Sequence, residues 1–280
     1  MEIYETINQT KNYLKGFRDK GKSIGFVPTM GALHEGHLTL IRAATKENDI
    51  VVCSIFVNPT QFNNKNDLEN YPRDFESDIN KLQKEKCDLV FHPSVEEMYP
   101  EPATEVFDFG GLDKVMEGEF RPGHFNGVAT VVKRLFEIVE PERAYFGLKD
   151  YQQLVIIHKI TKDYNLPVEI VPCSTVREDD GLAMSSRNRL LSVPERHQAA
   201  DIYETLKMVK VQSGYTPISE LKEHVEKFFR KNKFFKFEYF EIVDMYSLKP
   251  LRNWAESKNA VACIAVYIGN VRLIDNIILF

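Results

Sequence analysis

Cysteine is scarce in this chain of 280 residues. The four cysteines, Cys53, Cys87, Cys173 and Cys263, are scattered, and no Cys-x-x-Cys pair is present. This spacing argues against a cysteine-based zinc site and favours reduced, packed thiols. No apolar run approaches the ~20 residues of a membrane span, and the first residues lack the basic and apolar regions of a signal peptide. We therefore expect a cytoplasmic protein with no membrane partner.

Concentrated positive charge is also missing. Lysine and arginine number 36 against 41 aspartates and glutamates, which gives a formal net charge of −5. Because a protein that binds phosphate backbones needs a concentrated basic face, nucleic acid is not an expected partner. The sequence has no internal repeat, heptad run or low-complexity tract, and its length suggests about two domains.

What the first part of the sequence does contain is a regular alternation of short β-branched runs and amphipathic segments. This rhythm predicts an α/β unit with a parallel sheet and crossover helices. The expected strands are residues 23–27, 50–57, 88–91, 143–146 and 168–171. The expected helices are residues 38–46, 73–86, 127–139 and 151–163. Ligands of such sheets bind beyond the carboxyl ends of the strands, where the motifs below all lie.

The pattern changes after residue 176. A polar loop to residue 188 is followed by expected helices at 194–212 and 217–231, each opened by a proline that suits a first turn. Three expected antiparallel strands then follow at 235–244, 260–268 and 271–279. The sequence therefore predicts a first domain over residues 1–175 and a smaller α+β domain over residues 176–280.

The segment 28–37, Pro-Thr-Met-Gly-Ala-Leu-His-Glu-Gly-His, connects the first of these strands to a helix. Such a turn directs unpaired backbone N–H groups and the positive end of the helix dipole to one point, which predicts a phosphate site. His34 and His37 lie on this turn, and partly cationic imidazoles can donate to phosphate oxygens. Gly36 leaves room for a base or phosphate to approach the backbone. A zinc pair is the alternative, although the spacing differs from that of the metalloprotease helix.

Two further motifs leave alternatives open. Asn58-Pro-Thr-Gln-Phe follows the second strand, and the amides of Asn58 and Gln61 could bind a hydroxylated, anionic small molecule. Taken alone, that segment is better explained as an ordinary turn. In Arg-Pro-Gly-His, Arg121 and His124 could face an anion, or the segment could be a structural turn.

Residues near the carboxyl end of the parallel pattern also suit an anionic ligand. Lys149 stands where a helix starts, which is unfavourable unless an anion or carboxylate offsets its charge, and Asp150 suits the N-cap. Gln153 places an amide on an otherwise apolar helix face, so it needs a partner. Met-Ser-Ser-Arg-Asn at 184–188 offers two hydroxyls and a guanidinium that can hold phosphate oxygens on a mobile loop. A surface turn is the alternative there.

Together these pieces resemble one family. His-x-Gly-His, Asn-Pro-x-Gln-Phe, Tyr-Pro-Arg at 71–73, Arg-Pro-Gly-His-Phe-x-Gly-Val, Lys-Asp-Tyr-Gln-Gln and Ser-Ser-Arg-Asn occur in this order in the pantothenate synthetases, or pantoate–β-alanine ligases. The motifs run from about residue 25 to residue 189. Asn63 replaces a usual glycine and Leu148 replaces a commonly polar residue, which leaves the loop after Phe62 less defined.

The resemblance implies a Rossmann-like domain that binds nucleotide and pantoate, a smaller carboxy-terminal lid domain, and a homodimer. It implies that ATP and pantoate give pantoyl adenylate and pyrophosphate, and that β-alanine then releases pantothenate and AMP. Mg²⁺ would accompany the ATP phosphates, and none of the motifs specifies a protein ligand for it.

The resemblance also implies site residues. His37 is assigned an acid role, and His34, Lys149, Ser185, Ser186 and Arg187 have the right chemistry to stabilise phosphoryl charge. Pantoate and β-alanine would meet Gln61, Gln153, Asn58 and Met30. The residues implied to bind ATP are Met30, Gly31, Ala32, Leu33, His34, Glu35, Gly36, His37, Gly147, Leu148, Lys149, Asp150, Val176, Met184, Ser185, Ser186 and Arg187.

Two rival hypotheses remain. A nucleotidyltransferase that joins AMP to a phosphate substrate would share the His-x-Gly-His motif but would leave Gln61 and Gln153 unexplained. A nucleotide-binding regulatory module could use the same fold, since fold alone does not establish catalysis. Intact Lys149 and Arg187 count against that second hypothesis.

Overall fold

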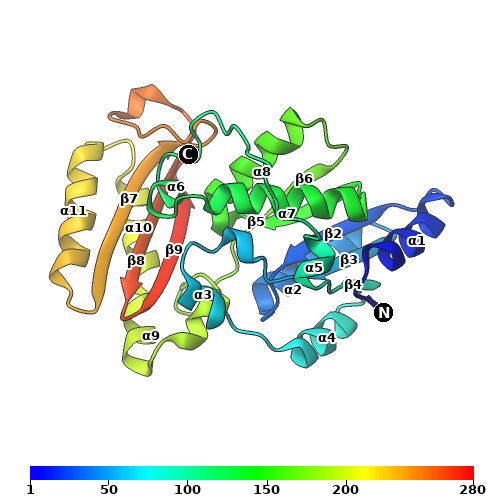
Figure 1. Ribbon diagram of the computed structural model, residues 1–280. Coiled ribbons are helices and arrows are strands. Elements are labelled where there is room, and N and C mark those ends of the chain that lie inside the picture. Colours follow the sequence, from blue (N-terminus) through cyan, green and yellow to red (C-terminus); the bar gives the residue numbers. More distant parts are fainter.

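The computed structural model describes residues 1–280, apart from the side chain of Lys65. A parallel sheet of six strands and an antiparallel sheet of three strands lie at opposite ends of the molecule (Figure 1). The large sheet has the order β1-β4-β3-β2-β5-β6. Its strands are β1 (Glu2–Tyr4), β2 (Ile24–Thr29), β3 (Ile50–Ile55), β4 (Leu89–Phe91), β5 (Arg143–Gly147) and β6 (Glu169–Cys173). The predicted parallel α/β fold is confirmed.

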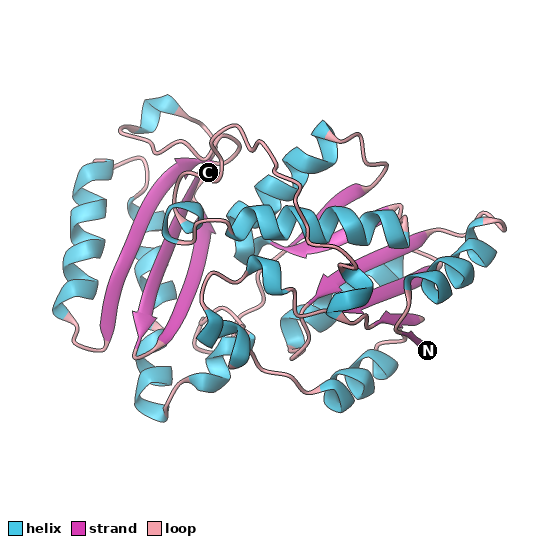
Figure 2. Cartoon of the chain, viewed as in Figure 1, coloured by secondary structure: helices cyan, strands magenta, loops and turns pink.

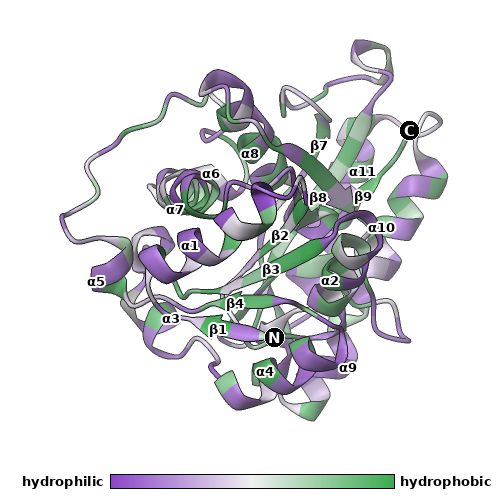
Figure 3. Cartoon of the chain, turned by 90° about the vertical axis from the view of Figure 1, so that its right-hand side faces the viewer, coloured by the Kyte–Doolittle hydropathy of each residue, from purple (hydrophilic) through white to green (hydrophobic). Residues whose placement is uncertain are grey.

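Helices cover both faces of this sheet (Figure 2). Along β2, Phe26 packs with the side chains of α1 and α7 in one core cluster, whereas Val27 packs with those of α2 and α4 in another. Apolar strands are therefore enclosed on both sides, as Figure 3 shows. The helices before residue 175 are α1 (Ile7–Arg18), α2 (Glu35–Glu47), α3 (Lys65–Glu69), α4 (Phe75–Lys84), α5 (Val95–Met98), α6 (Glu117–Phe120), α7 (His124–Val139) and α8 (Tyr151–Asp163).

The strand order reverses at β2, because β3 and β5 lie on its two sides. The connections that leave β2 and β5 diverge from this point, so a crevice opens at their carboxyl ends. This switch point lies where the His-x-Gly-His turn leaves β2 and where Lys149 follows β5.

The carboxy-terminal sheet is also packed on both faces. Ala262 and Ile264 contribute to a cluster with α10 and α11, whereas Val261, Cys263 and Tyr239 join the core that contains α7 and α8. The two units thus share one continuous core. The elements are α9 (Val193–Ala199), α10 (Asp201–Gln212), α11 (Ile218–Lys231), β7 (Phe235–Asp244), β8 (Ala260–Ile268) and β9 (Val271–Ile278). Among the helices described, none has the length and apolar character needed to cross a membrane.

Some sequence expectations of structure were incomplete or wrong. The single helix expected at 194–212 is two helices, because the backbone N–H of Ala200 bonds to the carbonyl of Gln198 and interrupts the regular ladder. β1 and α1 were not predicted. β1 is a short edge strand that pairs only with β4, and so it has little periodicity of its own.

Candidate active site

A cleft of about 1130 Å³ opens at the carboxyl ends of β2, β3 and β5. One wall is the large sheet with the loops that leave it, and the other includes β9 of the small sheet. This size suits a nucleotide together with a small acid. The cleft brings together the motifs that lie far apart in the sequence.

A buried carboxylate holds the turn after β2. Asp78 on α4 accepts the backbone N–H groups of Ala32 and Leu33, each at 2.7 Å. Lys81, one turn further along α4, donates to the carbonyl of Leu33 at 2.8 Å. Gly31 adopts a φ of +81°, and a Cβ there would lie 3.1 Å from the Asp78 carboxylate. The sequence reasoning missed Asp78, because nothing local distinguishes it from a surface acid of α4.

Three further N–H groups of the turn are also engaged. The N–H of Gly31 donates to Thr29 Oγ1 at 3.2 Å. That of His34 donates to His37 Nδ1 at 3.3 Å, and that of Gly36 donates to His34 Nδ1 at 3.2 Å. The expectation that free backbone N–H groups of this turn bind the anion is therefore wrong for these residues.

His34 and His37 form a reciprocal cap at the start of α2, with ring centroids 4.1 Å apart. Because each Nδ1 accepts a hydrogen bond, each neutral ring carries its proton on Nε2. Burial lowers the pKa of His34 to about 4, and the Lys149 cation adds to this effect. Burial, with the neighbouring His34 ring, holds the pKa of His37 well below its usual range. The expectation of partly cationic rings is wrong, and both rings offer a neutral Nε2–H group.

Gly36 is required by its neighbour. A Cβ at this position would lie 2.9 Å from two atoms of the His34 ring. The open space expected for a base or phosphate is thus occupied by the imidazole that caps the helix. Any larger residue would displace that ring from the cleft.

Lys149 lies in the 3₁₀ turn Leu148–Asp150 that follows β5. Its Nζ is 3.5 Å from Asp150 Oδ1, so a carboxylate offsets its charge as expected. Asp150 stands at the N-cap of α8, but its side chain makes no capping hydrogen bond. Asn276 on β9 donates to the carbonyls of Leu148 and Lys149 at 2.9 and 2.8 Å. The small sheet therefore fixes the lysine turn.

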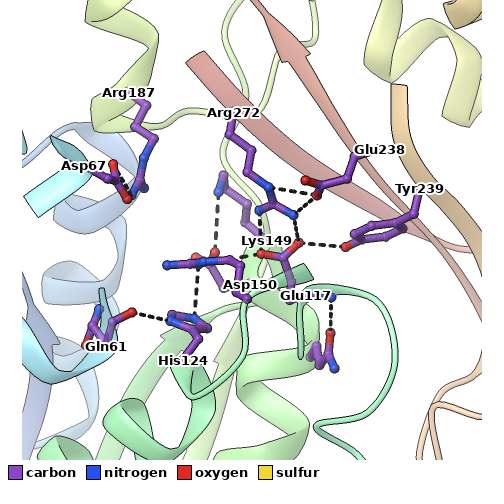
Figure 4. Close-up of polar contacts among 12 residues, drawn as sticks. Gln61, Asp67, Glu117, His124, Lys149, Asp150, Arg187, Glu238, Tyr239 and Arg272 are labelled. Carbon is purple, nitrogen blue, oxygen red and sulfur yellow. Dashed lines mark hydrogen bonds and ion pairs between the residues drawn. The ribbon is translucent and has the colours of Figure 1, made fainter. Parts of the chain in front are cut away.

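The Ser-Ser-Arg loop faces the segment around α3. Arg187 Nη2 lies 3.2 and 3.0 Å from the two carboxylate oxygens of Asp67 (Figure 4). Tyr71 Oη is 3.3 Å from Ser186 Oγ, and its ring lies under the Arg187 guanidinium at 5.4 Å. Ser185 Oγ accepts the N–H of Arg187 at 3.3 Å. A carboxylate of the chain thus pairs with the arginine that was predicted to hold phosphate.

The amide motif after β3 contains two buried amides with different roles: Asn58 supports the turn, and Gln61 lines the cleft. Asn58 is 1% exposed, and its Nδ2 donates to Gln61 Oε1 at 3.2 Å and to the Gly127 carbonyl at 3.1 Å. Its Oδ1 accepts from Thr60 and Tyr99. Asn58 is therefore occupied by protein groups, contrary to the expectation that it presents its amide to a ligand.

Gln61 and Gln153 both line the cleft. Gln61 Nε2 lies 3.0 Å from Met30 Sδ, a weak acceptor that a ligand oxygen can replace. Gln153 is half-buried on the first turn of α8. The structure thus brings together the two amides predicted for pantoate.

A charged network joins α6 to the small sheet across the cleft (Figure 4). Glu117 accepts two hydrogen bonds of 2.7 Å from Arg272 and one of 2.9 Å from Tyr239. Arg272 also pairs with Glu238. Burial raises the pKa of Glu117, but the Arg272 contacts outweigh this and hold it at about 2. The sequence analysis did not identify this network.

Most of the residues predicted to bind ATP line the cleft, but five do not. Ala32 and Leu33 are fully buried, Glu35 turns outward to pair with Arg42, and Leu148 packs against the core. Gly31 shapes the turn through its positive φ, and its N–H donates to Thr29. The predicted residues that do line the cleft are Met30, His34, Gly36, His37, Gly147, Lys149, Asp150, Val176, Met184, Ser185, Ser186 and Arg187.

A switch-point cleft that gathers imidazoles, cations and hydroxyls beside a pair of amides defines an α/β enzyme of the nucleotide-using class. The family model for pantoate–β-alanine ligase matches residues 2–278. The chain belongs to the pantoate–β-alanine ligase family, and the family predicted from the motifs is confirmed.

Individual relatives agree over the whole chain. The chain is 51% identical over 278 residues to a pantothenate synthetase of Porphyromonas gingivalis, with 99% of each chain covered. The structure of pantothenate synthetase from Thermus thermophilus matches all of both chains, with a TM-score of 0.93 and 44% identity. The ligase of Francisella tularensis, complexed with β-γ ATP and β-alanine, matches with a TM-score of 0.84 and 38% identity over 100% of this chain and 98% of that one.

Proposed function

We propose that this chain condenses pantoate with β-alanine at the expense of ATP, and releases pantothenate, AMP and pyrophosphate. The observation that carries the proposal is the convergence of phosphate-type donors with Gln61 and Gln153 in one cleft. The comparisons support the same substrates, because the Francisella ligase was crystallised with an ATP compound and β-alanine.

In the first step, a pantoate carboxylate oxygen attacks the α-phosphorus, and the bond from that phosphorus to the pyrophosphate oxygen breaks. The chain supplies no nucleophile to this step, so its role is alignment and charge stabilisation. The Nε2–H groups of His34 and His37 donate to phosphate oxygens as neutral imidazoles. Lys149 and Arg187 neutralise the charge that moves onto the departing pyrophosphate, and Ser185 and Ser186 donate their hydroxyls.

Pantoate is held by the amides. Gln61 and Gln153 each donate and accept, which suits a molecule with two hydroxyls and a carboxylate. Met30 covers the dimethyl carbon, and Asn58 acts indirectly by orienting Gln61. In the second step, the β-alanine nitrogen attacks the pantoyl carbonyl carbon and the carbon–oxygen bond to AMP breaks. The ammonium nitrogen releases two protons to solvent in all as it becomes the amide nitrogen.

Mg²⁺ is proposed as the counter-ion of the ATP phosphates. Among the described residues, no group of three histidines, cysteines or acids is placed to hold a metal. The phosphates and water must then provide most of its ligands, as is usual for this ion. Asp150 and Asp67 are the carboxylates that pair with Lys149 and Arg187, and either could provide one oxygen. Bound Mg²⁺ would add positive charge where pyrophosphate leaves.

We further propose a homodimer, a cytoplasmic location, and a division into residues 1–175 and a lid of residues 176–280. The resemblance to the family supports the dimer, and the four unpaired thiols support the location. Because the small sheet shares a core with α7 and α8, we place lid movement in the loop around 184–188. Light scattering in solution would test the dimer.

Isotope exchange tests the reaction directly. The chain is incubated with ATP, Mg²⁺ and labelled pyrophosphate, and label should enter ATP only when pantoate is added. Complete turnover with β-alanine should release AMP and pyrophosphate in equal amounts. Release of ADP and phosphate would refute the adenylate mechanism, and exchange independent of pantoate would favour another nucleotidyltransferase. ATP binding without any exchange would favour the regulatory module.

A further inference from the structure

Arg121 lies in the wall of the same cleft and has no role in the steps above. Its side chain is 18% exposed. Nη1 lies 3.2 Å from His124 Nε2 and 3.7 Å from Glu117 Oε2. Within the described chain, its polar contacts involve Nη1 alone. Nε and Nη2 make no hydrogen bond to the described residues, and neither is fully buried. These two nitrogens therefore keep some exposure, on a side chain that lines the cleft.

The charge of Arg121 is only weakly compensated by the protein. Glu117, its nearest carboxylate, already accepts hydrogen bonds from Arg272 and Tyr239. His124 offers Arg121 a neutral acceptor, because burial and the adjacent guanidinium lower the pKa of His124 to about 4. A mostly buried guanidinium with only one nitrogen engaged is a candidate site for an anion, and its planar donors match a carboxylate.

The position of this cation next to the amide pair identifies the anion. Since Arg121 donates to His124 Nε2, the ring proton is on Nδ1, which donates to the carbonyl of Gln61 at 2.8 Å. One imidazole thus separates Arg121 from the residue proposed to hold pantoate. Lys149 and Arg187 are assigned to the phosphates, and the amides bring no charge for a second carboxylate. β-Alanine carries that carboxylate two methylene groups from the nitrogen that must attack.

We infer that the Arg121 guanidinium binds the carboxylate of β-alanine and so selects a short ω-amino acid over a neutral amine. This inference rests on the proposed function. It assigns Arg121 to the second step alone, so the first step should proceed without it.

Arg121→Gln tests the inference, because a glutamine amide can still donate to His124 while the charge is removed. Pantoate-dependent exchange, which needs no β-alanine, should stay within about 2-fold of the unaltered enzyme. The KM for β-alanine should rise about 10- to 100-fold, the loss typical of one charge-assisted contact. The rate with 3-aminopropanamide, which lacks the carboxylate, should change little. The KM of Arg121→Lys for β-alanine should lie between those of the unaltered enzyme and Arg121→Gln.

Arg230→Gln is the matched control, since this arginine is exposed on α11 and pairs with Glu226. It should leave both steps unchanged. An unaltered KM for β-alanine in Arg121→Gln would overturn the inference. A loss of pantoate-dependent exchange as large as the effect on β-alanine would also overturn it, because Arg121 would then contact ATP or pantoate. If the unaltered enzyme shows no pantoate-dependent exchange, this result refutes the proposed function, and the inference that rests on it is refuted as well.

Discussion

At the scale of single residues, Asp78 determines the shape of the turn that presents the histidines. A carboxylate that accepts two buried N–H groups keeps Ala32 and Leu33 fixed where the helix begins. Burial raises the pKa of Asp78, but these two hydrogen bonds favour its charged form. Asp78 thus fixes the turn, whereas His34 and His37 cap the start of the helix that follows it.

We expect Asp78→Asn to destabilise the protein and weaken ATP binding together. An asparagine keeps one acceptor and points an N–H group at a backbone N–H group, so one buried donor loses its partner. The free energy of unfolding should fall by about 1–3 kcal/mol, measured by urea denaturation, and calorimetry should show weaker ATP binding. Glu76→Gln on the exposed face of α4 should change neither value. Tight ATP binding in Asp78→Asn would show that the turn does not depend on this carboxylate.

The buried histidines predict a pH dependence of stability. The folded pKa values of His34 and His124 are about 4, below the usual value of about 6.5. Between these pH values the unfolded chain binds more protons, so stability should be complete above about 6.5 and fall as pH decreases towards 4. Urea denaturation at pH 7.5 and pH 5 should show this loss. His124→Gln should reduce the difference, whereas the exposed His197→Gln should leave it unchanged.

At the scale of elements, the sequence predicted those with strong periodicity. α8 begins and ends where expected because its apolar positions recur at helical spacing. β1 and the break at Ala200 were missed, because an edge strand of three residues and a local interruption of the helical hydrogen bonds leave little trace in the hydrophobic periodicity. Likewise the motifs located His34, Lys149 and Arg187, but only tertiary structure reveals which N–H groups are already engaged.

The contact between α3 and the Ser-Ser-Arg loop predicts competition with ATP. Because Asp67 holds Arg187 with two contacts of 3.0 and 3.2 Å, phosphate must displace a carboxylate. Asp67→Asn should therefore bind ATP several-fold more tightly, as a partly exposed ion pair is worth about 0.2–1 kcal/mol. Calorimetry checks the affinity, with the exposed Glu69→Gln on the same helix as control. Weaker binding in Asp67→Asn would instead show that Asp67 assists the nucleotide.

At the scale of the whole molecule, the cleft exists because two units are fixed against each other. Asn276 bonds the lysine turn, and Tyr151 on α8 donates to the carbonyl of Met245 at 3.0 Å. The pair of Glu117 and Arg272 adds a buried charged contact between α6 and β9. The position of the Lys149 turn in the first unit therefore depends on Asn276 of the small sheet.

Breaking that pair should cost far more than replacing its whole charged cluster. Arg272→Met leaves the Glu117 carboxylate buried with only Tyr239 and the more distant Arg121, so unfolding free energy should fall by about 3–5 kcal/mol. Arg272 also pairs with Glu238, so replacing the whole cluster, as Glu117→Gln and Glu238→Gln with Arg272→Met, should recover most of this loss because neither carboxylate stays unpaired. Arg230→Met, which breaks an exposed pair, should cost less than about 1 kcal/mol.

The pair of Glu117 and Arg272 also predicts how the free energy of unfolding changes at low pH. The folded pKa of Glu117 is about 2, below its ordinary value of 4.5, so its contribution is present above 4.5 and is lost as pH falls towards 2. In Arg272→Met the carboxylate loses the contacts that lower its pKa, so this part of the acid sensitivity should disappear. Urea denaturation of both proteins between pH 7 and pH 3 measures the difference. Equal acid sensitivity in the two proteins would show that the contact between the units is not electrostatic.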